Sequence, residues 1–199
     1  MLASGMDEAE ILELCQQFEK ELEESSMAES LALTPVDLSE FAPATRKILT
    51  SWQLTTLGEL QMLSTTELSW IEGFGRARRE RLRHYLEAQE PPLRFRDRRE
   101  SFLERADTVY GGLDRVPASL LALVALQLSE ISEAEAWLAA LETQEWLTIG
   151  DLREVTAGRL RHCLPDFSYG SRESRVDVLI DWLRKHGVLS SLCFWRQAK

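Results

Sequence analysis

The sequence has little that would serve a disulfide framework, a metal centre or a membrane span. Its three cysteines, Cys15, Cys163 and Cys193, are far apart and odd in number, which excludes a disulfide framework and a zinc-binding set. It has no run of about 18 apolar residues, so we expect no membrane-spanning helix and no membrane partner. Its first ten residues lack the basic and apolar segments of a signal peptide, which indicates a cytoplasmic protein.

Catalytic motifs are equally scarce. The three histidines, His84, His162 and His186, have no acid or cysteine at metal-ligand spacing. The sequence also contains no nucleophile motif, no phosphate loop of the Walker type and no convincing carboxylate pair. We therefore expect a protein that is not an enzyme and that uses no metal, cofactor or small-molecule substrate.

Residues that favour β-strands are few, with 14 Ile and Val against 33 Leu and 18 Ala. Leu and Ala favour helices, and apolar residues recur at helical spacing, so we predict an all-α fold. Ser64–Glu67 and Ser132–Glu135 fit the capping box that begins many helices. Pro35 and Pro117 suit the first turn of a helix.

The net charge of −10 is distributed unevenly. Residues 1–40 hold eleven acidic side chains and one base, Lys20, and so account for all of it. Residues 73–99 hold nine arginines against four acids, whereas residues 106–149 hold seven acids and one arginine. A net negative charge argues against a nucleic-acid partner. Here, however, all of that charge belongs to the N-terminal segment, so this argument does not apply to the arginine-rich block.

Charge and periodicity divide the chain into four parts. They are an acidic amphipathic helix at about 6–26 with a linker to residue 37, a first compact unit at 38–92, connecting helices at about 95–109 and 117–131, and a second unit with a C-terminal tail at 132–199. The apolar stripe of the first helix and a tryptophan near the C-terminus that we expect to be exposed are candidate contacts for a protein partner: Ile11, Leu14, Phe18, Leu22 and Trp195.

The two units repeat one another at an offset of 92 residues. Leu57-Gly58-Glu59-Leu60 aligns with Ile149-Gly150-Asp151-Leu152, a pattern typical of a short helix entered from a turn. The first unit continues to a Gly73-Phe74-Gly75 hairpin and a basic helix from Arg76. The second has Pro165–Gly170 at this place, and its proline and Asp166 suit a structural or protein-binding copy.

Residues 41–86, with Thr56–Leu60, Glu67-Leu68 and Gly73–Arg76, resemble the C-terminal domain of the bacterial RNA polymerase alpha subunit. More broadly they resemble the helix-hairpin-helix modules of DNA repair proteins, and residues 133–186 do so more weakly. The resemblance implies a compact helical domain that touches the DNA backbone and transcription regulators. The positions where the family has an Arg and an Asn on its first helix hold Ala44 and Lys47 here, and its Lys-Ser pair falls on Ala77-Arg78. Contact with phosphates is therefore a better expectation than reading of a groove.

The hairpin also predicts phosphate contact on physical grounds. Glycines let a phosphate approach the backbone closely, and the following helix directs free N–H groups and its positive dipole end at the anion. The candidate residues for nucleic-acid contact are Lys47, Gly73, Gly75, Arg76, Arg78 and Arg79. A plain turn with Phe74 filling the core is the alternative.

Two functions stay open at this point. The first is a nucleic-acid-associated adaptor linked to transcription or DNA handling, with a DNA or RNA backbone and a protein as partners. The second is a pure protein–protein adaptor that keeps the same scaffold. The stretch Arg94–Arg99 fits either function. Arginines alternating with an aromatic side chain suit contact with nucleic acid. A helix that begins with basic residues would equally pair with the acidic segment 1–40.

Overall fold

The structure is a computed structural model that describes residues 16–17, 20, 30–165 and 174–189. The described residues form helices and turns, and their only β pairing is two isolated bridges, which confirms the all-α prediction. None of these helices is both long and apolar enough to span a bilayer. The predicted partner contacts Ile11, Leu14, Phe18, Leu22 and Trp195 lie outside the described residues, as does most of the predicted N-terminal helix.

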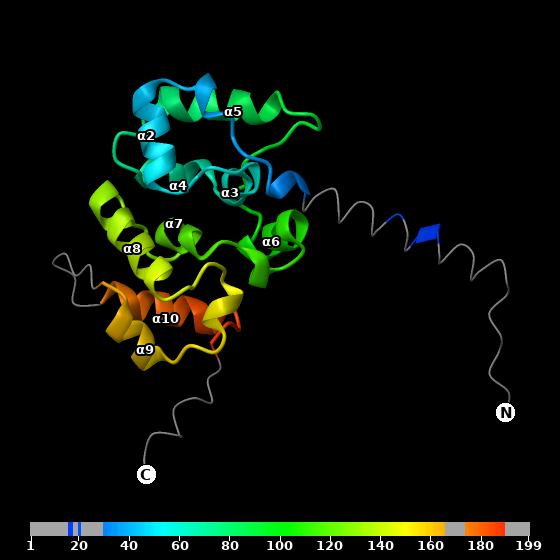
Figure 1. Cartoon of the computed structure of the whole chain (residues 1–199). Coiled ribbons are helices and arrows are strands. Elements are labelled where there is room, and N and C mark those ends of the chain that lie inside the picture. Colours follow the sequence, from blue (N-terminus) through cyan, green and yellow to red (C-terminus); the bar gives the residue numbers. More distant parts are fainter. Residues whose placement is uncertain (1–15, 18–19, 21–29, 166–173, 190–199) are drawn as a thin grey trace, which may run out of the picture.

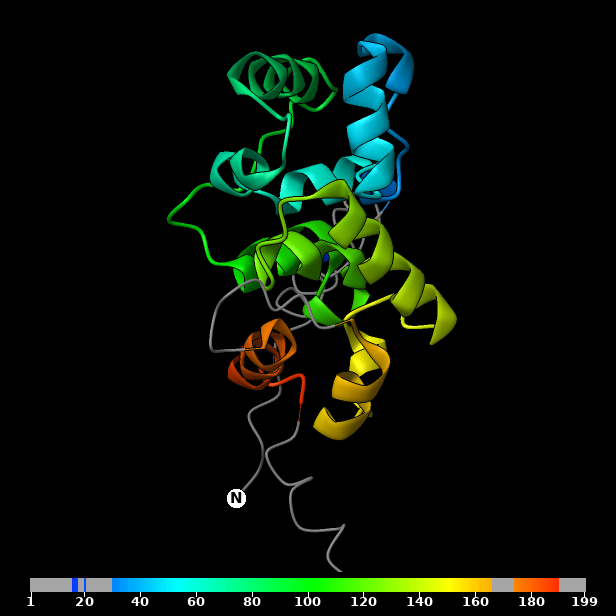
Figure 2. The same ribbon diagram turned by 90° about the vertical axis from the view of Figure 1, so that its left-hand side faces the viewer.

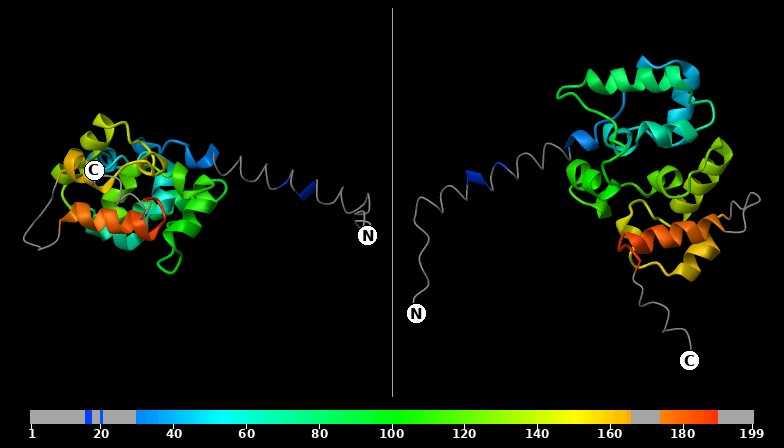
Figure 3. Two further views of the ribbon diagram at one scale, coloured as in Figure 1. Left: turned by 90° about the horizontal axis from the view of Figure 1, so that it is seen from below. Right: turned by 180° about the vertical axis from the view of Figure 1, so that it is seen from behind.

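The helices are stacked along one axis of the molecule (Figure 1). At one end lie α2 (Pro43–Ser51) and α5 (Arg76–Glu87), followed by α3 (Leu57–Met62) and α4 (Thr65–Trp70). The middle holds α6 (Phe102–Tyr110), α7 (Leu121–Val124) and α8 (Ile131–Thr143), and the far end holds α9 (Ala157–Cys163) and α10 (Arg175–Lys185). Short 3-10 turns link them: η1 (Leu38–Glu40), η2 (Leu113–Arg115), η3 (Ala118–Leu120) and η4 (Gly150–Leu152). Views from the side and from behind show the same order (Figures 2 and 3).

One backbone pattern occurs twice, 92 residues apart. After α2, Gln53 has a left-handed φ of 50°, and after α8, Glu145 has a φ of 58°. In each case the next N–H donates back to the helix, Leu54 to Leu49 O at 2.8 Å and Trp146 to Leu141 O at 3.0 Å. The sequence repeat thus corresponds to a repeat of local backbone geometry.

The two short helices that follow also begin in the same way. The Glu59 carboxylate accepts the backbone N–H groups of Thr55 and Thr56 at 2.6 and 2.8 Å. The Asp151 carboxylate accepts those of Leu147 and Thr148 at 3.0 and 2.7 Å. The acid after each repeated glycine therefore holds the turn that precedes it.

The prediction that Pro35 and Pro117 lie in the first turn of an α-helix is wrong. Each lies in an isolated antiparallel bridge, to Thr56 and to Thr148. The segment around Pro35 is also part of the core, because Ala32 and Val36 are buried. The predicted linker therefore extends too far, and the compact structure already includes the residues from about 30 onward.

The predicted connecting helices are much shorter than expected. Helix α6 begins at Phe102 and not near residue 95, because the preceding segment is held extended against α3 and α4. The stretch 117–131 contains only η3 and α7, although it is buried along most of its length, as its apolar sequence predicts. The capping box predicted at Ser132 is also wrong, since α8 begins at Ile131 and Glu133 accepts the N–H groups of Ser129 and Glu130.

Candidate nucleic-acid interface

The hairpin between α4 and α5 is built from two glycines with different tasks. Gly73 has a φ of 76°, a left-handed conformation that L side chains rarely adopt. Gly75 is the N-cap of α5 and has open space where a Cβ would be. Phe74 between them is buried in the core, so the phenylalanine anchors the turn, whereas the two glycines are exposed.

The first backbone N–H groups of α5 are free to bind an anion. The N–H groups of Arg78 and Arg79 donate to Gly75 O at 3.1 and 3.2 Å. Within the described ranges, no acceptor receives the N–H of Gly75, Arg76 or Ala77. All three residues are exposed, and a helix N-terminus with unpaired donors favours negative charge.

Two arginines shield the carbonyl oxygens of the turn. The Arg78 guanidinium donates to Gly73 O, and that of Arg79 donates to Phe74 O at 2.8 Å. These acceptors are neutral, so each guanidinium keeps its full positive charge. The carbonyls would otherwise repel a phosphate, and the arginines therefore make the surface of the hairpin more uniformly positive. Sequence reasoning assigned these arginines to charge alone and missed their bracing role.

The exposed faces of α5 border two different grooves. One face, at i, i+3, i+4 and i+7 spacing, meets α4 in an open groove of about 420 Å³ lined by Thr65, Thr66, Ser69, Arg76, Arg79, Glu80 and Arg83. The opposite face borders a groove lined by Asp37, Glu40, Arg81, His84, Tyr85, Ala88 and Gln89. The second groove contains two carboxylates and pairs Arg81 with Glu40 at 3.7 Å. The first groove is the more positive of the two.

Lys47 lies on α2 rather than on the hairpin itself. It is exposed and precedes Ile48, whose side chain would be 3.5 Å from a Cβ at Gly73. Helix α2 thus packs against the hairpin. The hairpin and the start of α5 hold Gly73, Gly75, Arg76, Arg78 and Arg79, whereas Lys47 lies on the adjoining helix and forms no hydrogen bond or ion pair with them in the described structure. Thr65, Thr66, Glu80 and Arg83 were missed; the helical spacing from Arg76 to Arg83 is the sequence signal that identifies the last two.

The stretch Arg94–Arg99 is used inside the protein. Arg96 forms an ion pair with Glu67 and donates to Met62 O at 3.0 Å, and Phe95 is buried. These residues neither start a helix nor present an exposed alternation of base and aromatic, so the two readings of this stretch are corrected. Within this stretch, Arg98 and Arg99 are exposed and form no ion pair with the residues that the structure describes.

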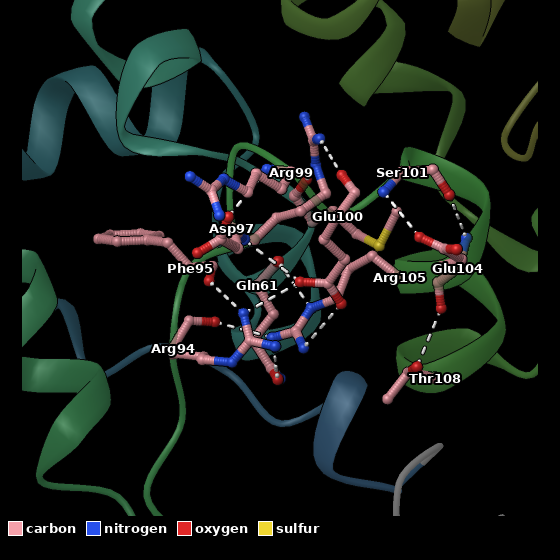
Figure 4. A network of polar contacts seen from close by, with 12 residues as sticks. Gln61, Arg94, Phe95, Asp97, Arg99, Glu100, Ser101, Glu104, Arg105 and Thr108 are labelled. Carbon is pink, nitrogen blue, oxygen red and sulfur yellow. Dashed lines mark hydrogen bonds and ion pairs between the residues drawn. The ribbon is translucent and has the colours of Figure 1, made fainter.

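A buried arginine from α6 completes this internal network (Figure 4). Arg105 donates to Gln61 O, Gln61 Oε1 and Arg94 O at 3.1, 3.2 and 2.8 Å. Burial lowers the pKa of Arg105, although the nearby Glu100 carboxylate opposes this shift. Figure 4 shows the Arg94 and Arg105 side chains on either side of Gln61. The network fixes the segment that returns from α5 to the middle of the molecule.

Comparisons with known proteins add no assignment. No family model, no curated protein and no solved structure matches the chain. Among the described side chains, no group of three or more His, Cys, Asp or Glu residues could hold a metal ion.

Proposed function

We propose that this protein is a non-enzymatic, nucleic-acid-associated adaptor whose Gly73–Gly75 hairpin contacts the phosphate backbone of DNA or RNA. A helix-hairpin-helix type of unit at residues 38–92 makes this contact. A related second unit and the acidic N-terminal segment bind a protein partner. The process that this adaptor serves is one of transcription or DNA handling, as the sequence resemblance implies.

The observation that carries the proposal is the combination of free donors and shielded acceptors at the hairpin. Three consecutive N–H groups have no described acceptor, and the two turn carbonyls are covered by Arg78 and Arg79. A phosphate placed before α5 would meet these N–H groups and the neighbouring guanidiniums. Such contacts hold a backbone without reading its sequence.

The test is the salt dependence of binding to a short DNA duplex and to an RNA of equal length. Arg76→Gln is the informative variant, because Arg76 is exposed and has no described partner, whereas changes at Arg78 or Arg79 would also disturb the hairpin. We expect this variant to weaken binding and to reduce the log–log salt slope by about 0.9, the value for one phosphate contact on a duplex.

Lys185→Gln is the matched control, since it removes one exposed charge from α10 at the far end of the molecule. It should leave the slope unchanged. Equal slopes for wild type and Arg76→Gln would overturn the hairpin contact. Undetectable binding at low salt would leave the second function, a protein–protein adaptor on the same scaffold.

A further inference from the structure

The groove between α4 and α5 has a lining suited to a second anion. All seven lining residues are polar, and they include three arginines and three hydroxyl side chains. The hydroxyls of Thr65 and Thr66 have no hydrogen-bond partner in the described structure, whereas Ser69 donates to Thr66 O at 2.6 Å. No aromatic or aliphatic side chain lines the groove, so it offers nothing on which a base could stack.

One phosphate cannot occupy both ends of this groove. Arg76 and Arg83 are seven residues apart on α5, which is about 10 Å along the helix axis at 1.5 Å per residue. An anion at the hairpin amides would lie at the Arg76 end of the groove, and a neighbouring phosphate of the same strand would lie toward the Arg83 end. The groove therefore continues the hairpin site along the helix.

The far end of the groove is occupied by an internal ion pair. Arg83 contacts Glu80 at 2.5 Å and Glu87 at 3.6 Å. Glu80 lines the groove and Glu87 does not. The Glu80 carboxylate thus takes the place on Arg83 that an incoming phosphate would use, and it repels that phosphate as well.

We propose that the α4–α5 groove is a second phosphate subsite, which holds a neighbouring phosphate of the same nucleic-acid strand through Arg83, Thr65 and Thr66, and that Glu80 weakens it by competing for Arg83. This inference rests on the proposed function, because the strand enters the groove from the hairpin. The ligand class is a phosphodiester backbone without any contribution from its bases.

The decisive experiment compares Glu80→Gln with Glu87→Gln in binding to the same short duplex at low salt. Both variants remove one negative charge that contacts Arg83, but only Glu80 lies in the groove. We expect Glu80→Gln to tighten binding about two- to fivefold, the range for one exposed ion pair. Glu87→Gln should tighten it distinctly less. Equal effects of the two variants would show a general charge effect and would overturn the subsite.

A second arm removes the hydroxyls without changing charge. Thr65→Val with Thr66→Val keeps the side-chain shape, and we expect binding to weaken by about tenfold or more from the lost bonds to a charged group, with an unchanged salt slope. Unchanged affinity would contradict the subsite.

If Arg76→Gln reduces the slope while all groove variants behave as wild type, only the subsite fails. If wild type does not bind, the proposed function and the subsite fail together.

Discussion

At Gly58 two segments that are far apart in sequence come too close for a side chain. A Cβ at this position would lie 2.7 Å from Ala32 O and 2.9 Å from Ala32 Cα. The repeated Gly150 is in the same situation, with Asp114 O at 2.8 Å. Ala32 lies three residues before Pro35, and Asp114 lies three residues before Pro117. The two glycines therefore allow the same close contact in the two repeats, each with the segment that leads to a proline in an isolated β-bridge.

Gly58→Ala should therefore destabilise the fold by about 1–3 kcal/mol, the usual cost of overpacking. The measurement is the free energy of unfolding by chemical denaturation. Gly158→Ala is the control, because Gly158 is an exposed residue within α9 whose nearest neighbour lies 4.0 Å from the added Cβ. That variant should gain stability from helix propensity; equal losses in both variants would contradict the close approach.

The Glu59 carboxyl is buried at the start of α3, and burial raises its pKa above the ordinary value of 4.5 although the N–H groups of Thr56 and Thr55 oppose this. A raised folded pKa adds stability below the ordinary pKa and loses it as the pH rises through the folded pKa. The wild type should thus lose stability as the pH rises from about 4 to about 7, whereas Glu59→Gln, which has no carboxyl to ionise, should not. The free energy of unfolding of the variant should therefore rise relative to that of the wild type over this range. Denaturation at both pH values tests this. If the wild type instead gained stability relative to the variant toward neutral pH, the hydrogen bonds to the Glu59 carboxylate would outweigh the effect of burial on its pKa.

At the scale of elements, a buried side chain of α6 holds the segment between α5 and α6 in place. Arg105 is buried and satisfies three acceptors on Gln61 and Arg94. Arg105→Met should cost about 2–4 kcal/mol, because it leaves the two buried acceptors of Gln61 and the part-buried Arg94 O without this partner. Arg98→Met, at an exposed arginine, should change the free energy of unfolding by less than about 0.5 kcal/mol. Similar effects of the two changes would show that the network adds little.

Local signals predicted some elements well and others poorly. Helix α4 begins at its predicted capping box, since Ser64 and Glu67 satisfy each other's backbone N–H groups. The start of α6 was misjudged because the bonds of Arg96 and Arg105 to α3 and α4 connect residues 29 to 44 positions apart. Such tertiary bonds hold a segment extended whatever its helix propensity. The spacing of apolar residues along the sequence does not indicate them, because it reflects only local structure.

For the whole molecule, the separation of charge matters more than its sum. The arginines of α5 lie at one end of the stack, and the acidic stretch 106–149 forms its middle (Figure 3). The sequence alone revealed the arginine block and the glycine hairpin, because both are contiguous. It could not reveal the groove, whose hydroxyls and guanidiniums come from two helices and are brought together only by the turn at Gly73.

Deletion of residues 1–29 should raise the affinity for nucleic acid. These residues contain nine acids and one base, and their removal lowers the repulsion between the chain and a polyanion. A deletion through residue 37 would be uninformative, since it also removes the buried Ala32 and Val36. Binding to the short duplex at low salt is the measurement, and the gain should shrink as salt screens the charge. Unchanged or weaker binding after the deletion would contradict a repulsive role.

The central claim is that a phosphate backbone meets the free N–H groups in front of α5. An amide-resolved NMR titration of the full chain with the short duplex tests it most directly. We predict that the largest shifts occur at the amides of Gly75, Arg76 and Ala77, with smaller shifts along α5 and none at α10. Shifts centred on α9 and α10, or unchanged amides at Gly75–Ala77 under saturating duplex, would contradict it.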